Sequence, residues 1–216
     1  MARKVGSAGK TLARRLGRIA LVLLGFGFAV WLLVQLFAPW MGALALPLAF
    51  LAVMRLLQDK EVGREVVAKA RGYLGEARVG RVLEALPSPW RVFHDVDLGG
   101  ENADHVVVGP AGVFNVEVKN YTGLIRATPQ GLWVRGERRD DLVRQAWRQA
   151  HKLRELLGVE VEPLLVFVGG RLEGRRVGRL PVLPPEEVGA YLRGLPARLS
   201  FTEAQRVSKL LEGRVR

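Results

Sequence analysis

The sequence contains no cysteine, and this excludes a disulfide-stapled scaffold, a thiolate zinc site and a cysteine nucleophile. Histidine is also scarce, and His94, His105 and His151 do not have the spacing of a zinc site. Of the 216 residues, 49% are hydrophobic and 25% are charged, which excludes wholesale disorder. The length suits one ordinary domain, or a smaller domain with an appended segment.

Acidic residues are missing from residues 1–58, which carry seven Lys and Arg side chains. These unmatched charges supply more than half of the net charge of +12. The rest of the chain is only mildly basic. That balance permits a nucleic-acid partner without requiring one.

Two apolar runs fill residues 19–57. Residues 19–38 carry no charge, and residues 40–57 carry only Arg55, near the end. At about 1.5 Å per helical residue, such runs reach about 27–30 Å, the thickness of a bilayer core, and Pro39 breaks the helix between them. We therefore expect a transmembrane helical hairpin in contact with the lipid bilayer. A cleaved signal peptide and a buried hairpin of a globular protein stay open as alternatives.

Positive charge flanks both apolar runs on one side. Six Lys and Arg precede residue 19 and others follow residue 57, whereas the connecting turn has none. The positive-inside rule then predicts a cell-membrane protein with both termini in the cytoplasm. Residues 1–18 would be a basic cytoplasmic N-terminus, residues 58–70 a charged linker helix, and residues 71–216 a cytoplasmic domain.

Helical and extended patterns alternate within residues 71–216. We expect helices ending near residue 86 and over 140–157, 184–195 and 202–212, the last with a Thr202–Gln205 capping box. We expect strands over 91–98, 103–109, 112–120 and 164–168, and a strand pair within 123–136. This order predicts an α/β or α+β fold with a mixed sheet flanked by helices.

A small group of polar side chains carries the chemistry. On the predicted strand over residues 112–120, Glu117 and Lys119 are two residues apart and therefore project from one face. Asp104, on the partner strand, can reach the same place. Two carboxylates and a lysine can bind Mg²⁺ and hydrolyse a phosphodiester, since the ion activates a water and the lysine offsets negative charge. A surface ion pair without chemistry is the alternative that spacing alone leaves open.

Several motifs follow one another at a specific spacing: Gly75-Glu76, Asp104 to Gly109, Gly112 to Phe114, Glu117 to Asn120, and Gly123. In this order they resemble the NERD family, the nuclease-related domain, over residues 71–157. That family is similar to the PD-(D/E)XK, restriction-endonuclease-like superfamily. The resemblance implies a central mixed sheet flanked by helices, with a metal-dependent nuclease site.

The resemblance also implies a role for each matching residue. Asp104, Glu117 and the backbone carbonyl of Val118 would bind Mg²⁺ or Mn²⁺, and Lys119 would be the catalytic lysine. Ala103 stands where the superfamily signature has proline, which is not a ligand.

Two residues on helices complete the implied site. Glu76 lies at the edge of an apolar helical stripe, where a carboxylate is either at the rim of the core or directed into a site. By resemblance it would support the metal–water network. Gln145, on the later helix, would lie beside the site.

Arginines gather before and along that later helix. Either they form a solvated face, or they contact a phosphate backbone and make binding strongly salt-dependent. The residues concerned are Arg138, Arg139, Arg144 and Arg148.

These features together predict a membrane-anchored nuclease-like protein that hydrolyses DNA or RNA phosphodiesters at the cytoplasmic face with Mg²⁺ or Mn²⁺. The alternative is a catalytically silent, membrane-anchored module that binds nucleic acid or acts as a scaffold. Metal affinity discriminates between the two, because only a working site requires Asp104 and Glu117 to coordinate. A domain that binds a protein partner is a third possibility, which a salt-insensitive interaction would favour.

Overall fold

The computed structural model describes residues 3–5, 21–32 and 60–215, together with the single residues 36, 48, 50, 51 and 55. The chain divides into two compact units. One comprises residues 10–71, and the other comprises residues 72–216 with the first nine residues.

In the unit of residues 10–71, residues 21–32 form a helix with exposed apolar side chains such as Leu21 and Phe26. Most of the predicted hairpin over residues 19–57 lies outside the described residues. Within the described part of the chain, no helix combines the length and apolar character needed to cross a bilayer. Residues 60–71 are helical and begin α3 (Lys60–Glu84).

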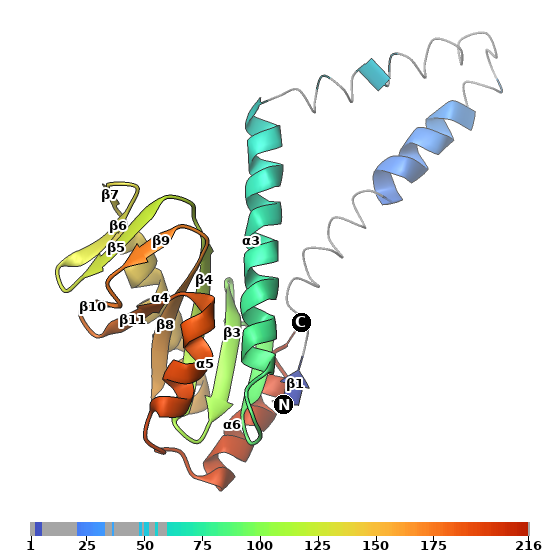
Figure 1. Cartoon of the computed structure of the whole chain (residues 1–216). Coiled ribbons are helices and arrows are strands. Elements are labelled where there is room, and N and C mark those ends of the chain that lie inside the picture. The colour runs from blue at the N-terminus through green and yellow to red at the C-terminus, as the bar shows by residue number, and fades with distance from the viewer. Residues whose placement is uncertain are drawn as a thin grey trace. The chain divides into compact units, whose positions relative to one another are not determined.

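The larger unit is built on a mixed seven-stranded sheet (Figure 1). Antiparallel pairing joins β2 to β3, β3 to β4 and β10 to β11, whereas β1–β2, β4–β8 and β8–β11 are parallel. In spatial order the strands are β1 (Arg3–Val5), β2 (Arg91–Asp97), β3 (Asn102–Gly109), β4 (Gly112–Asn120), β8 (Val161–Val168), β11 (Leu180–Leu183) and β10 (Arg176–Val177). The expected hairpin at residues 103–120 is therefore confirmed as β3–β4.

A second, four-stranded sheet follows directly on β4 along the chain. It contains the expected strand pair within residues 123–136 and two short strands that the sequence pattern did not predict. In spatial order its strands are β7 (Glu137–Arg138), β6 (Gly131–Val134), β5 (Leu124–Thr128) and β9 (Arg171–Glu173). Its apolar face packs on the helix Asp140–Leu157 and on β8.

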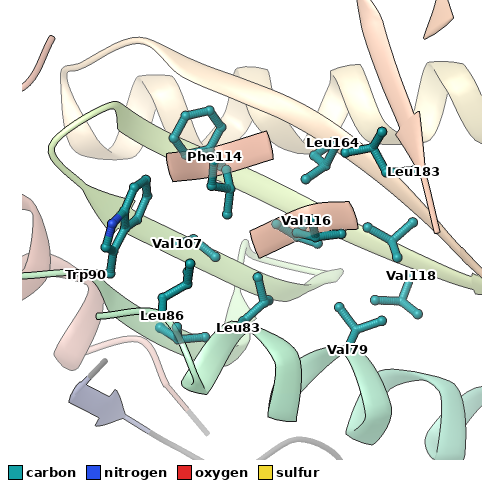
Figure 2. Close-up of a cluster of buried hydrophobic side chains, with 14 of the residues drawn as sticks. Val79, Leu83, Leu86, Trp90, Val107, Phe114, Val116, Val118, Leu164 and Leu183 are labelled. Carbon is teal, nitrogen blue, oxygen red and sulfur yellow. The ribbon is translucent and has the colours of Figure 1, made fainter. Parts of the chain in front are cut away.

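Helices cover both faces of the large sheet, as expected. On one face, α3 and α5 (Pro185–Gly194) pack against alternate strand residues, and Figure 2 shows Val79 and Leu83 of α3 meeting Val116 and Val118 of β4. On the other face lie α4 (Asp140–Leu157) and α6 (Phe201–Glu212). Burial of both apolar faces supplies the main driving force for this layered arrangement.

The helix ends show one correct and one wrong expectation. Gly158, which follows α4, adopts the left-handed conformation with φ 66°, as its position after the last apolar residue predicts. The expected capping box of the last helix is wrong. Ser200 is the cap, because its backbone is extended and its hydroxyl accepts from the N–H of Glu203, whose carboxylate accepts from the N–H of Ser200.

Candidate active site

The helix α3 brings Glu76 to the end of β4 through a glycine. A Cβ atom at Gly75 would lie 3.2 Å from Cβ of Asn120, closer than side chains ordinarily approach. The missing side chain therefore lets this turn of α3 pack directly on the last residue of β4. Glu76 follows Gly75 on the helix, and Lys119 precedes Asn120 on the strand.

Asp104 and Glu117 lie opposite each other where β3 and β4 separate. The ladder between the strands ends at the pair His105 and Val116, one residue before Asp104 and Glu117 meet. Beyond that point a side chain replaces the backbone partner, since the N–H of Val118 donates to Oδ2 of Asp104 over 2.7 Å. The two carboxylates project from the face that α4 covers.

Glu117 is the centre of the group. Its side chain is 2% exposed, and its Oε1 accepts from Nζ of Lys119 at 2.5 Å and from Nε2 of Gln145 at 2.7 Å. Its other oxygen, Oε2, is buried and has no hydrogen-bond partner among the described residues. The structure thus brings together four of the residues singled out in the sequence: Asp104, Glu117, Lys119 and Gln145.

Electrostatics at this site oppose ionisation of the Glu76 and Asp104 carboxyls. Burial, then the charges of Asp95 and Glu117, raise the pKa of Glu76 to about 7. Burial, then the charges of Glu117 and Glu76, raise the pKa of Asp104 well above its ordinary value, although the N–H of Val118 acts in the other direction. These shifts mean that negative charge is concentrated here without enough positive charge to balance it.

Lys119 is the positive group inside this negative site. Burial on its own lowers the pKa of Lys119, but the charge of Glu117 and the hydrogen bond to it outweigh burial, so the pKa is raised above 10.5. The ammonium group therefore stays charged at neutral pH and donates hydrogen bonds.

The donor set is one of hard oxygens, the kind that Mg²⁺ and Mn²⁺ prefer. The buried and unpartnered Oε2 of Glu117 fits such an ion, because a cation would supply the partner that this oxygen lacks. Across the described residues, no group of three or more His, Asp or Glu side chains is arranged to hold a metal. An ion here would therefore rely on two carboxylates together with backbone or water oxygens.

The arginines expected at a nucleic-acid surface already have acidic partners. Arg138 contacts Asp140 over 2.7 Å, Arg139 contacts Asp141 over 2.8 Å, and Arg148 contacts Glu101 over 2.9 Å. Arg144 is exposed on α4, one residue before Gln145. The structure therefore favours a solvated, ion-paired face for most of this set.

Two residues near the site, Asp95 and Tyr121, were not predicted from the sequence. Asp95 has a left-handed backbone with φ 54°, which is unusual for a residue other than glycine, and accepts from Asn102 over 2.6 Å. Its charge acts on Glu76. Tyr121, two residues after Lys119, carries the guanidinium of Arg139 over its ring at 5.3 Å. The strand pattern held no signal for either role.

Comparisons with known proteins agree with this geometry at the level of the family. Residues 71–168 match the family model described as NERD, nuclease-related domain. An uncharacterized protein of Bacillus anthracis is 35% identical over 103 residues, which is 44% of this chain and 48% of that protein. The chain thus matches about half the length of that curated relative.

Among solved structures, SfsA of Pyrococcus furiosus in complex with Ca²⁺ matches 66% of this chain and 54% of its own, at 13% identity and a TM-score of 0.25. A likeness at this score supports no conclusion about site or activity. The family match rests on the sequence of the segment that holds the carboxylates, the lysine and the glutamine. Residues 71–168 thus carry a match to the NERD family of nuclease-related domains, a family whose fold is restriction-endonuclease-like.

Proposed function

We propose that this protein is a metal-dependent nuclease that hydrolyses DNA or RNA phosphodiesters. One observation carries the proposal. The buried carboxylate of Glu117 has one oxygen held by Lys119 and Gln145 and the other without a partner in the described structure. A buried carboxylate with an unpartnered oxygen, beside Asp104, whose pKa burial raises well above its ordinary value, is costly for folding and suits a cation site.

Asp104, Glu117 and the backbone carbonyl of Val118 would hold Mg²⁺ or Mn²⁺. In an extended strand the N–H and C=O of one residue point to the same side. Because the N–H of Val118 donates to Asp104, its carbonyl also faces the Asp104 side of β4, which supports this assignment. When bound, such an ion polarises a phosphate and lowers the pKa of a coordinated water.

The other site residues handle charge and protons. Lys119 stays protonated, so its proposed role is to position a water or to offset negative charge on the phosphate, and not to act as a base. The pKa of Glu76, at about 7, suits a carboxylate that accepts a proton from water near neutral pH. Gln145 orients the carboxylate of Glu117 through its hydrogen bond.

Nucleic acid would approach over the start of α4. Arg139 lies above the ring of Tyr121, and Arg144 is exposed one residue before Gln145, so these two are the better-placed phosphate contacts. Arg138, Arg139 and Arg148 would have to exchange their partners, Asp140, Asp141 and Glu101, for phosphate.

Residues 19–57 would anchor this domain in the cell membrane as a two-helix hairpin, with the nuclease-like domain at the cytoplasmic face. The charge flanking the apolar runs supports this topology. The pairing of β1 with β2 supports it independently, because it assigns residues 3–5 to the same unit as residues 72–216. The chain between them must then cross a bilayer an even number of times.

A catalytically silent, anchored nucleic-acid-binding or scaffolding module is the second candidate. It is favoured by the finding that no three acidic or His side chains within the described residues form a group suited to a metal. Turnover distinguishes the two candidates.

The test is cleavage by the purified full-length protein of single-stranded, duplex and branched DNA and of RNA, with Mg²⁺, Mn²⁺ or EDTA. Lys119→Ala, checked for folding, should lose activity by about 10²-fold or more, whereas Lys152→Ala on the outer part of α4 should retain it. Folded wild-type protein that binds nucleic acid but cleaves none of these substrates would favour the silent module.

A further inference from the structure

Two histidines form a buried pair on the face of the sheet that α3 covers. His94 on β2 and His105 on β3 lie directly opposite each other in the antiparallel ladder, and both side chains are 0% exposed. Their Nδ1 atoms are 2.8 Å apart and the rings are perpendicular. No step of the proposed hydrolysis uses either ring.

Both outer nitrogens of the pair reach α3. Nε2 of His105 lies 3.2 Å from the backbone carbonyl oxygen of Glu76, and Nε2 of His94 lies 3.1 Å from Oε1 of Glu84. Midway between these two glutamates, a Cβ atom at Gly80 would lie 3.4 and 3.5 Å from the two rings. Any side chain larger than a methyl group there would collide with them, so the helix packs closely on the pair across two turns.

The partners fix where the protons lie. A carbonyl oxygen only accepts, so His105 donates from Nε2 to Glu76, and burial together with the charge of His94 lowers the pKa of His105 to about 3, so the ring is neutral. Its Nδ1 must then accept from Nδ1–H of His94. Nε2 of His94 lies within ion-pair distance of the Glu84 carboxylate. Two hydrogen bonds, one between the rings and one from His105 to the Glu76 carbonyl, therefore join β2, β3 and α3.

We propose that this histidine pair is a positioning device for Glu76, an inference that rests on the proposed function of the same site. His105 directly follows Asp104 on β3 and bonds to the backbone of Glu76 on α3. The pair therefore fixes the helix turn of one site carboxylate against the strand residue next to another. Because His105 bonds to the backbone carbonyl of Glu76, the bond fixes the position of this residue and leaves its carboxylate available for the reaction.

The proposal is tested by measuring kcat and KM of full-length variants that differ in one hydrogen-bond donor. His94→Phe/His105→Phe removes both partners of the inner bond together, so no buried polar atom of that bond is left unpaired. We expect its kcat to fall about 10- to 100-fold with KM changed less than about twofold, because the residues that contact substrate are intact. His94→Phe/His105→Gln should recover at least part of the kcat, because a glutamine amide can donate to the Glu76 carbonyl. Ser208→Ala, which removes the buried hydroxyl bond to Ala204 on α6, should leave kcat unchanged.

Wild-type kcat in the folded double phenylalanine variant would overturn the proposal, as would equal kcat values in the phenylalanine and glutamine variants. A second measurement does not depend on cleavage. Long-range ¹H–¹⁵N NMR of the wild-type protein should show His105 neutral with its proton on Nε2, and a proton on Nδ1 would overturn the assignment. If the wild-type protein cleaves nothing, the proposed function fails. The role of the pair in holding α3 is then decided by the NMR result and by hydrogen exchange, which should be faster in α3 of the double phenylalanine variant.

Discussion

Two buried polar clusters lie on opposite faces of the same strands, and they are built in opposite ways. In the histidine cluster (Glu84, His94, His105 and the Glu76 carbonyl), each nitrogen faces a partner on another element. In the carboxylate cluster (Asp104, Glu117, Lys119 and Gln145), an oxygen of Glu117 lacks a partner in the described structure and the pKa of Asp104 is raised. Adjacent residues, Asp104 and His105, belong to different clusters because side chains alternate along β3.

The difference means that the histidine cluster stabilises the fold, whereas the carboxylate cluster lowers its stability. A fully paired buried network rigidifies its surroundings, whereas a partly paired one costs stability and is retained where it has a function. In the histidine cluster the ring nitrogens lie against protein groups. In the carboxylate cluster, Oε2 of Glu117 lacks a hydrogen-bond partner in the described structure, and the proposed cation would supply one.

The largest effect that can test this contrast is expected from Asp104→Asn. This change should reduce metal-dependent cleavage by about 10³-fold or more, through loss of a metal ligand. In EDTA at pH 8 it should nevertheless raise the melting temperature, because ionised Asp104 is disfavoured by burial and by the charges of Glu117 and Glu76. Calorimetry and the cleavage assay on the same protein check both results.

Glu101→Gln is the matched control. Hydrogen bonds from Arg148 and Lys152 hold the pKa of Glu101 at about 2, so this carboxylate is stabilised in its charged form. The Glu101→Gln variant should have a slightly lower melting temperature and unchanged cleavage activity. A destabilised Asp104→Asn protein would remove the contrast between the two clusters.

A smaller effect is expected from pH. The pKa of Glu76 is raised from 4.5 to about 7, so in the folded protein this group is protonated below about pH 7. The raised pKa contributes stability to the metal-free fold below about pH 4.5, and that contribution is lost as the pH rises through about 7. Metal binding should therefore strengthen between pH 5 and about 7, as the proton that competes with the cation is lost.

Titration with Mn²⁺ at a series of pH values measures this dependence. Glu76→Gln should shift or remove the inflection near pH 7. An affinity for Mn²⁺ that does not vary between pH 5 and 8 would contradict the proposed charge excess of the carboxylate cluster.

The smallest effect is expected at the surface beside the carboxylate cluster, where Lys119 is partly exposed. Arg139 lies over Tyr121 beside Lys119, and Arg139→Ala should weaken nucleic-acid binding a few-fold and lower the salt slope by about 1. Arg154→Ala, at the far end of α4, is the control and should change neither. Equal slopes for wild type and Arg139→Ala would remove Arg139 from the proposed contacts.

The sequence predicted most of the large sheet and the residues of the carboxylate cluster. Alternation over residues 112–120 was enough to put Glu117 and Lys119 on one face, and the turn at Gly109 to Gly112 was enough to pair β3 with β4. Both are local properties of two-residue periodicity and turn chemistry.

Other features could not be predicted because they depend on contacts between distant segments. The pairing of His94 with His105 needs the register of β2 on β3, and their bonds to Glu76 and Glu84 need α3 to pack on them. The short strands β7 and β9 gain their partners from β6 and β5 and have too few residues to show a pattern. The misplaced cap of α6 reflects two hydroxyl residues close together, of which only Ser200 has the extended backbone of a cap.

The sequence by itself thus determined the resemblance to the NERD family, the mixed sheet flanked by helices and the identity of the acidic and basic groups, because these follow from local periodicity and motif spacing. Tertiary structure decided which of these groups are paired and which are not. Burial of Glu117 with one unpartnered oxygen, the raised pKa of Glu76 and the contact between the two histidines all arise when α3 and α4 close on opposite faces of one sheet. Desolvation and hydrogen-bond satisfaction are properties of the packed molecule, and no stretch of sequence specifies them alone.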